Sequence, residues 1–268
     1  MDTVVSVDGT PIAYDRLGTG PALVLVGGAF QYRSFDQRTV RIAELLAERF
    51  TVYHYDRRGR GDSGDTPPYA IAREIEDLRA VVGAAGDPVY LFGQSSGAVL
   101  TLDAVNAGVP AAKVVVYEPP LIVDDTRPPV PADVVARLDA LLAAGRRGAA
   151  VELWLTEAVG VPAEQVEPMR ESPMWPGFEA AAPSLAYDAR VTMPTLTGRP
   201  LPADRWATVA VPVLVADGGA SPAWMRHAAD AVAEVLPGAR RRTLDGQRHA
   251  VAPEVIAPVL TDFFTGLG

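Results

Sequence analysis

Ser95 lies in a pattern that gives the chain its clearest candidate for a nucleophile: residues 93–97 read Gly-Gln-Ser-Ser-Gly. An apolar run, 89–92, precedes the pattern, and a helical pattern, 98–102, follows it. A serine between a strand and a helix lies on a sharp turn that exposes its hydroxyl, and small neighbours make that turn possible. The pattern alone occurs by chance in many proteins, so it is this setting that favours a catalytic Ser95.

A serine hydroxyl needs a base, and His249 is the best placed of the three histidines. His54 lies inside an apolar run and His227 inside a helical pattern, where packing or surface roles are expected. His249 instead follows the last apolar run and precedes the helical pattern 253–264. This places it at the same sheet edge as Ser95, and we expect it to be the general base.

The oxyanion of a tetrahedral intermediate needs two backbone N–H donors. The N–H of Ser96, directly after the nucleophile, supplies one. The apolar run 22–26 continues into residues 27–30, which read Gly-Gly-Ala-Phe, and glycines let the backbone approach a ligand closely. We expect Ala29 N–H to be the second donor, with an ordinary glycine turn as the alternative interpretation.

These residues require a sheet whose strands end at one common edge. Short apolar runs alternate with helical patterns, which is typical of parallel strands covered by helices on both faces. The expected strands are 22–26, 50–55, 89–92, 114–117, 211–216 and 241–244. Residues 4–7 and 12–14 flank an Asp-Gly turn and predict an antiparallel start. The sequence thus predicts an α/β fold with a doubly wound, mostly parallel sheet.

About 90 residues separate the strands predicted at 114–117 and 211–216, far more than one connection needs. Helical patterns at 132–144 and 147–159 predict a helical cap, inserted before the last two core strands. We expect the core domain to comprise 1–121 and 207–268, and the cap 122–206.

A largely apolar substrate is expected, because the predicted cap is rich in aromatic residues and methionines. Apolar cap residues and the loop after the strand 22–26 supply the candidate substrate contacts. These are Gly28, Phe30, Trp154, Met174, Trp175 and Tyr187. Most of the cap residues in this set could equally form the core of the cap itself.

The composition excludes several classes of function. A net charge of −9 and a pI near 4.9 argue against nucleic-acid binding, and we interpret the basic clusters at 57–60 and 240–242 as solvated. Without cysteine, and with three scattered histidines, no metal or other cofactor is expected. No apolar run of about 18 residues and no secretory signal is visible. We expect a cytoplasmic monomer or homodimer that acts on a small molecule and binds no membrane.

Residues 56–64 read Asp-Arg-Arg-Gly-Arg-Gly-Asp-Ser-Gly, which resembles the D-x-R-G-x-G-x-S loop of the α/β-hydrolase superfamily. Together with the Gly-Gly loop, the serine turn and the late histidine, this loop makes the chain resemble that superfamily from end to end. The resemblance implies the α/β-hydrolase fold, in which the loop is a structural landmark whose arginines shape turns.

The catalytic acid departs from the usual pattern of the superfamily. Its expected slot, after the next-to-last core strand, holds Ala220 or Ser221, and Asp217 comes too early. A second location known in the superfamily follows the preceding core strand, where this chain has Glu118. A Ser-Ser-Gly turn paired with this glutamate resembles the zearalenone lactonases. Glu118 is therefore the predicted acid, Asp217 is its main rival, and Asp245 is a weaker one.

The resemblance also indicates the chemistry. Haloalkane dehalogenases and epoxide hydrolases resemble this fold but use an aspartate where this chain has Ser95. We therefore expect hydrolysis of a carboxylic ester or lactone through an acyl-enzyme intermediate. An amidase or aminopeptidase of the same fold is the first alternative. A non-hydrolytic binding protein or a cofactor-free lyase or oxygenase is the second.

Overall fold

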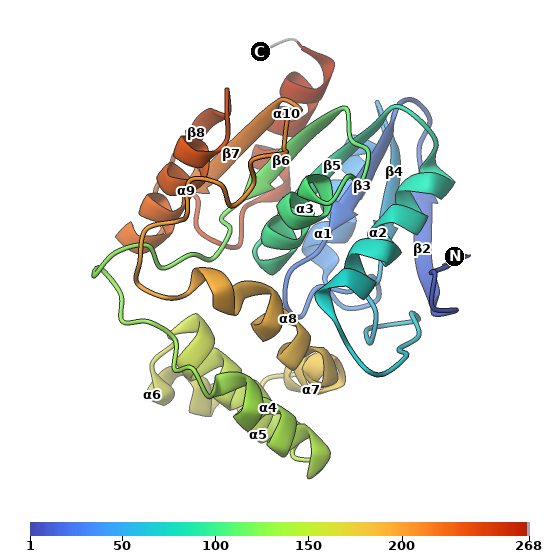
Figure 1. The fold of residues 1–268 in the computed structure, drawn as a ribbon. Helices are drawn as coiled ribbons and strands as arrows, with labels where there is room; N and C mark the ends of the chain where they lie inside the picture. Colours follow the sequence, from blue (N-terminus) through green and yellow to red (C-terminus); the bar gives the residue numbers. More distant parts are fainter. Residues whose placement is uncertain (267–268) are drawn as a thin grey trace.

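An eight-stranded sheet forms the centre of the molecule in the computed structural model, which describes residues 1–266 (Figure 1). The strand order is β1-β2-β4-β3-β5-β6-β7-β8; β1 and β4 pair with β2 antiparallel, and the other described pairs are parallel. The strands are β1 Asp2–Val5, β2 Pro11–Leu17, β3 Ala22–Val26, β4 Thr51–Tyr55, β5 Val89–Gln94, β6 Lys113–Tyr117, β7 Val213–Gly218 and β8 Arg240–Leu244. The predicted α/β class with a mostly parallel sheet is confirmed.

Helices cover both faces of the sheet, which explains why the central strands are apolar along their length. One face is covered by α2, α3 and α9, and the other by α1 and α10. These helices are α1 Gln37–Leu46, α2 Ile71–Ala85, α3 Ser96–Asn106, α9 Ala223–Val235 and α10 Pro253–Thr265. Within residues 1–266, no helix is long and apolar enough to cross a membrane.

The next-to-last strand begins two residues later than predicted, and the difference affects the choice of catalytic acid. The strand expected at 211–216 runs instead from Val213 to Gly218. Pro212 has no N–H to donate to a neighbouring strand, so regular pairing starts after it. Asp217 therefore lies inside β7 rather than in the loop beyond it.

The segment between β6 and β7 forms a group of helices, here called the insertion, at one end of the sheet (Figure 1). The patterns predicted at 132–144 and 147–159 are found as α4 and as α5 continued by η1, a π-helix. The insertion comprises α4 Val134–Ala143, α5 Arg147–Leu153, η1 Trp154–Val159, α6 Ala163–Val166, η2 Glu167–Glu171, α7 Trp175–Ala181, η3 Ala182–Ser184, α8 Leu185–Thr192 and η4 Met193–Thr195.

The insertion has an apolar core of its own. Leu121 packs in the core beside the sheet, whereas Ile122 packs in that of the insertion. Trp206, the last residue of the predicted cap, is fully buried beside the sheet. The chain has therefore returned to the main core by residue 206, and the domain limits 122–206 remain a prediction.

Candidate active site

Ser95 lies on the turn between β5 and α3, as the sequence predicts. Its backbone has φ 57° and ψ −129°, and its N–H donates to the carbonyl of Tyr117 at 3.0 Å. The turn brings α3 close to β3, because a Cβ added at Gly97 would lie 2.3 Å from the carbonyl oxygen of Val26. Glycine at position 97 is thus needed for the turn that presents the Ser95 hydroxyl.

His249 and Glu118 form a hydrogen-bonded pair at the same sheet edge. His249 Nδ1 lies 2.8 Å from Glu118 Oε2, and the other carboxylate oxygen accepts from the Gly218 N–H at 2.8 Å. Glu118 is fully buried, whereas the side chain of His249 is 41% exposed. The Gln94 amide donates to the backbone carbonyl of His249 at 3.0 Å and holds its loop. With Nδ1–H donated to Glu118, Nε2 is the nitrogen left to take a proton.

Asp217, the rival acid, has a different partner. It is also fully buried, but its Oδ1 accepts from Arg241 Nη1 at 2.6 Å. Arg241 is held by Asp230 of α9 as well, at 2.9 Å. The structure therefore brings Glu118, and not Asp217, to the histidine.

Three residues other than glycine have a positive φ among residues 1–266, and all three are candidate site residues. They are Phe30 at 62°, Ser95 at 57° and Glu118 at 45°. Side chains with a Cβ disfavour this conformation, and such strain costs on the order of 1–3 kcal/mol per residue. Strained backbone of this kind concentrates at functional sites, where the surrounding structure holds it in place.

The loop after β3 lies close to Ser95, where the two predicted oxyanion donors belong. A Cβ added at Gly28 would lie 2.7 Å from the Cβ of Ser95, so only glycine permits this approach. The Gly28 N–H itself donates to Gln31 Oε1 at 2.5 Å. The next N–H, that of Ala29, and the N–H of Ser96 find no acceptor within residues 1–266. Both groups are available to a ligand.

A cavity of about 540 Å³ connects these elements. Ser95, His249, Ala29 and Ser96 all line it. Although Ser95 and His249 share its wall, no hydrogen bond joins their side chains in the part of the chain described. Such contacts are often long before substrate binds. Most of the remaining wall is apolar and includes Phe30, Trp154, Leu155, Leu196, Trp224 and Met225.

The predicted substrate-contact residues divide into two groups. Phe30 and Trp154 line the cavity, as expected. Gly28 lies behind the nucleophile, where its carbonyl accepts from Arg60 at 2.5 Å. Met174 lies on the outer surface and is 52% exposed. The positions of Gly28 and Met174 do not fit the expected substrate contact.

Trp175 and Tyr187 also lie outside the cavity, for reasons of packing. Trp175 is buried in the core of the insertion, with its ring edge against Phe178. Tyr187 stacks on Tyr69 at a centroid distance of 3.9 Å and donates to Asp65 at 2.7 Å. The position of Trp175 thus fits the alternative given above, in which it forms part of the core of the insertion itself.

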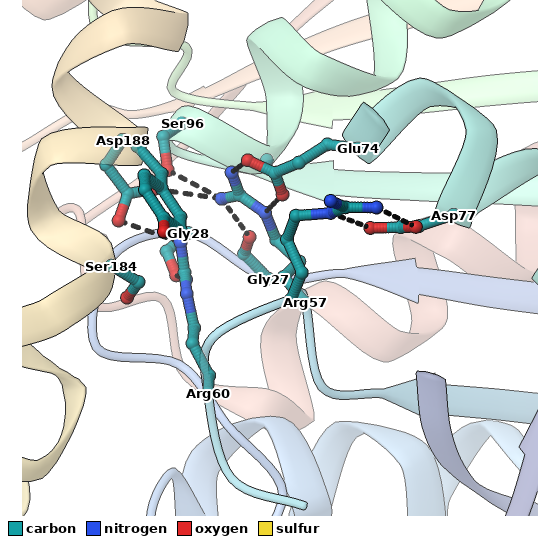
Figure 2. A network of polar contacts seen from close by, with 12 residues as sticks. Gly27, Gly28, Arg57, Arg60, Glu74, Asp77, Ser96, Ser184 and Asp188 are labelled. Atoms are coloured by element: carbon teal, nitrogen blue, oxygen red, sulfur yellow. Dashed lines mark hydrogen bonds and ion pairs between the residues drawn. The ribbon is translucent and has the colours of Figure 1, made fainter. Parts of the chain in front are cut away.

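The three arginines predicted to be solvated are buried instead. Arg57, Arg58 and Arg60 are 1%, 0% and 2% exposed, because each is paired with a carboxylate. Arg57 donates twice to Glu74, at 2.6 Å each, and once to Asp188, at 2.9 Å (Figure 2). The interpretation of these three arginines as solvated is therefore wrong. The sequence could not show their pairing, because the partner carboxylates are distant in sequence.

Asp188 of α8 ties the insertion to both loops that carry the candidate oxyanion donors (Figure 2). Its Oδ1 accepts from the Ser96 hydroxyl at 2.6 Å. Its Oδ2 accepts from Arg60 at 2.8 Å, and Arg60 donates in turn to the Gly28 carbonyl. Burial alone would raise the pKa of Asp188, but Arg60 and Arg57 hold that pKa below its ordinary value. The carboxylate is therefore ionised and fixes the position of both loops.

Sequence reasoning missed Arg127 and Trp224 in the cavity wall and the role of Asp188 behind it. Arg127 lies in residues 119–131, a proline-rich segment whose sequence favours a hinge between the core and the predicted cap. The signal that could have identified Arg127 is its position, since it is the only basic residue in that segment. For Asp188 the sequence offers no such signal.

Comparisons with known proteins agree with this geometry. The sequence model described as "Alpha/beta hydrolase family" matches residues 23–258. A solved α/β hydrolase from Sphaerobacter thermophilus DSM 20745 is 56% identical, with a TM-score of 0.90 over 98% of this chain and 100% of that one. The enol-lactonase from Burkholderia xenovorans LB400 is 18% identical, with a TM-score of 0.70 over 98% of this chain and 100% of that one, which shows the fold alone.

A relative of known sequence is more distant. The "Uncharacterized hydrolase YraK" of Bacillus subtilis (strain 168) is 36% identical over 104 residues, which make up 37% of this chain and 37% of that protein. This chain thus spans little more than a third of that relative's length. Since the family model covers most of the sequence, the chain belongs to the α/β hydrolase family.

Proposed function

We propose that this protein is a serine hydrolase that cleaves a carboxylic ester or lactone of a small, largely apolar substrate. The observation that carries the proposal is the fully buried Glu118 carboxylate bonded to His249, at the cavity that Ser95 also lines. In this arrangement the insertion, residues 122–206, acts as a cap that forms the substrate cavity with the core.

The proposed reaction has two steps. Ser95 Oγ attacks the carbonyl carbon while His249 Nε2 takes the hydroxyl proton, and the oxyanion accepts hydrogen bonds from the N–H groups of Ala29 and Ser96. Glu118 holds the tautomer of His249 and stabilises the imidazolium. His249 then gives its proton to the leaving alcohol, and a water molecule, activated in the same way, releases the acid and regenerates Ser95.

An apolar substrate fits the wall of the cavity, which is lined mainly by aromatic and aliphatic side chains. No aspartate or glutamate lines the cavity within residues 1–266. An aminopeptidase needs a negative group to bind the substrate ammonium, so the cavity favours the ester or lactone over that alternative.

The test combines covalent labelling with hydrolysis of p-nitrophenyl acetate and butyrate. A fluorophosphonate probe should label Ser95, and Ser95→Ala or His249→Ala should each lower kcat by about 10^4- to 10^6-fold, because the two residues act as a unit. The double variant should lose little more than either single one. Ser34→Ala is the matched control, since Ser34 is exposed and lies outside the cavity. Labelling of the Ser95→Ala variant, or additive losses, would contradict the proposal.

A further inference from the structure

Arg127 is the one permanently charged residue in the wall of the cavity, counted over residues 1–266. It lies at the start of the insertion, between β6 and α4, and no described carboxylate lies within 4.0 Å of its guanidinium. The fully buried arginines near the site, such as Arg57 and Arg60, are each neutralised by an acid. Arg127 thus differs from these arginines in having no ion-pair partner among residues 1–266.

The contacts that hold Arg127 use only part of its hydrogen-bonding capacity. Its Nη2 donates to the carbonyls of Ala158 and Glu157, at 2.8 and 3.4 Å, at the end of the π-helix η1. The guanidinium carbon lies 4.6 Å from the ring centroid of Trp224, a residue of α9 that lines the same cavity. Nη1 is buried and has no partner. The guanidinium is therefore positioned by two elements while one of its ends remains unsatisfied.

Trp154, another residue that lines the cavity, carries a second orphaned donor. Trp154 Nε1 is also buried without a partner. Two unsatisfied N–H donors on residues of a mostly apolar wall are costly, since each buried donor without an acceptor costs on the order of 1–3 kcal/mol. Both need a hydrogen-bond acceptor, and an anion satisfies a guanidinium best.

We infer that Arg127 binds a carboxylate carried by the substrate, so that the preferred substrate is an ester or lactone with a free carboxylate at a distance from the scissile bond. The inference rests on the proposed function and narrows its substrate class. An apolar wall with one uncompensated cation suits a short hydrocarbon chain or ring that ends in an anion. The protein as a whole carries a net charge of −9, which disfavours the approach of anions. The preference for a substrate carboxylate therefore depends on the local positive charge of Arg127.

The test uses pairs of esters that differ in one carboxylate. On the acyl side, mono-p-nitrophenyl glutarate is compared with p-nitrophenyl valerate; on the alcohol side, 4-carboxyphenyl acetate is compared with phenyl acetate. In at least one pair, wild-type kcat/KM should favour the carboxylate. In Arg127→Met that preference should fall by about 10- to 100-fold, mainly through KM, which is the loss expected for a charge-assisted hydrogen bond.

Two further variants separate recognition from a merely structural role. Arg199→Met removes the same charge from an exposed position outside the cavity and should leave the preference unchanged. Arg127→Lys keeps the charge but loses the planar fork, and should retain part of the preference. If Arg127 only capped η1, all esters would be affected alike and the ratio within each pair would not move. If Arg127→Met does not fold, the ratio of wild-type kcat/KM values within each ester pair still tests the inference, because the inference requires a preference for the carboxylate in at least one pair.

A binding measurement distinguishes failure of this inference from failure of the proposed function. Ser95→Ala should bind monoethyl glutarate more tightly than diethyl glutarate in calorimetry, and the added Arg127→Met change should abolish that difference. If wild type hydrolyses no ester but this binding difference is present, the proposed function fails and the inference stands. If esters are hydrolysed with no carboxylate preference in either pair, and the binding difference is absent, the inference is overturned.

Discussion

The adjacent strands β6 and β7 each carry a carboxylate at the same edge of the sheet, and the two carboxylates do different work. Glu118 and Asp217 are both fully buried. Glu118 follows the last residue of β6 and contacts His249, whereas Asp217 lies inside β7 and contacts Arg241. Burial therefore does not distinguish the carboxylate that contacts His249 from the one that contacts Arg241; the position of each relative to the end of its strand does.

The backbone explains the difference between the two sites. Glu118 has φ 45°, so the chain has left the extended conformation and the side chain is free to turn toward the loop of His249. Asp217 remains in regular pairing, opposite Thr243 of β8. A side chain within a strand must point to one face of the sheet, and that of Asp217 meets Arg241 beside α9.

The largest effect that tests this comparison is expected for Glu118→Gln. Glutamine keeps the shape but offers a single acceptor oxygen, which cannot serve both the Gly218 N–H and His249 Nδ1. The base would then favour the wrong tautomer, and kcat for p-nitrophenyl butyrate should fall by about 10^3- to 10^4-fold while the fold is retained. Thermal unfolding checks the fold.

Asp245→Asn is the matched control for that experiment. Asp245 precedes the base by four residues and is the weaker rival predicted from sequence, but it is exposed. Its kcat should stay near that of wild type. A large loss in Asp245→Asn, with Glu118→Gln close to wild type, would refute the assignment of Glu118.

Asp188, another buried carboxylate, is compared with Glu118 and Asp217 by its effect on the free energy of unfolding as well as on kcat. Asp188→Asn would leave Arg57 and Arg60 buried with one acid between them, and breaking such a pair costs about 3–5 kcal/mol of unfolding free energy. Since Ser96 and the Gly28 loop depend on the same network, kcat should also fall about tenfold, less than for loss of an oxyanion donor. Urea unfolding and steady-state kinetics measure the two effects.

The control for Asp188 is Asp139, an acid of α4 that forms an ion pair with a residue of α8. Asp139 binds Arg190 at 2.6 Å, but the side chains are 47% and 33% exposed. Exposed pairs contribute at most about 1 kcal/mol, so Asp139→Asn should be nearly silent in both measurements. Equal effects of the two variants would show that the buried network does not position the site.

Much of the core could be predicted from sequence because it depends on local patterns. Buried parallel strands read as apolar runs, and the serine turn is marked by Gly93 and Gly97 beside such a run. The strand limits were less certain: Pro212 moved the start of β7 by two residues. Glu118 could be identified as a candidate from sequence because it directly follows a strand. The role predicted for it came from resemblance to known hydrolases.

The cavity wall could not be predicted in the same way, because it depends on contacts between distant segments. Asp188 and Arg57 are 131 residues apart in sequence, and no local pattern announces their pairing. Likewise, an apolar residue of the insertion has the same pattern whether it faces its own core, as Trp175 does, or the cavity, as Trp154 does. For this reason only two of the expected substrate contacts, Phe30 and Trp154, lie in the cavity wall.

The smallest effect is expected for Asp217→Asn, which removes the charge from the rival acid. Asparagine keeps the Oδ1 acceptor for Arg241, which retains Asp230 as a second partner and is 23% exposed, so the cationic side chain is not stranded. Unfolding free energy should fall by about 1.5–3 kcal/mol, the range for a hydrogen bond to a charged group. The kcat for p-nitrophenyl butyrate should stay within about tenfold of wild type, because Asp217 does not touch the base. Asp230→Asn removes the other, 57% exposed, partner of Arg241 and serves as the control for stability without touching β7. A thousandfold loss of kcat in Asp217→Asn, with Glu118→Gln almost unchanged, would reverse the comparison and assign the orienting role to β7.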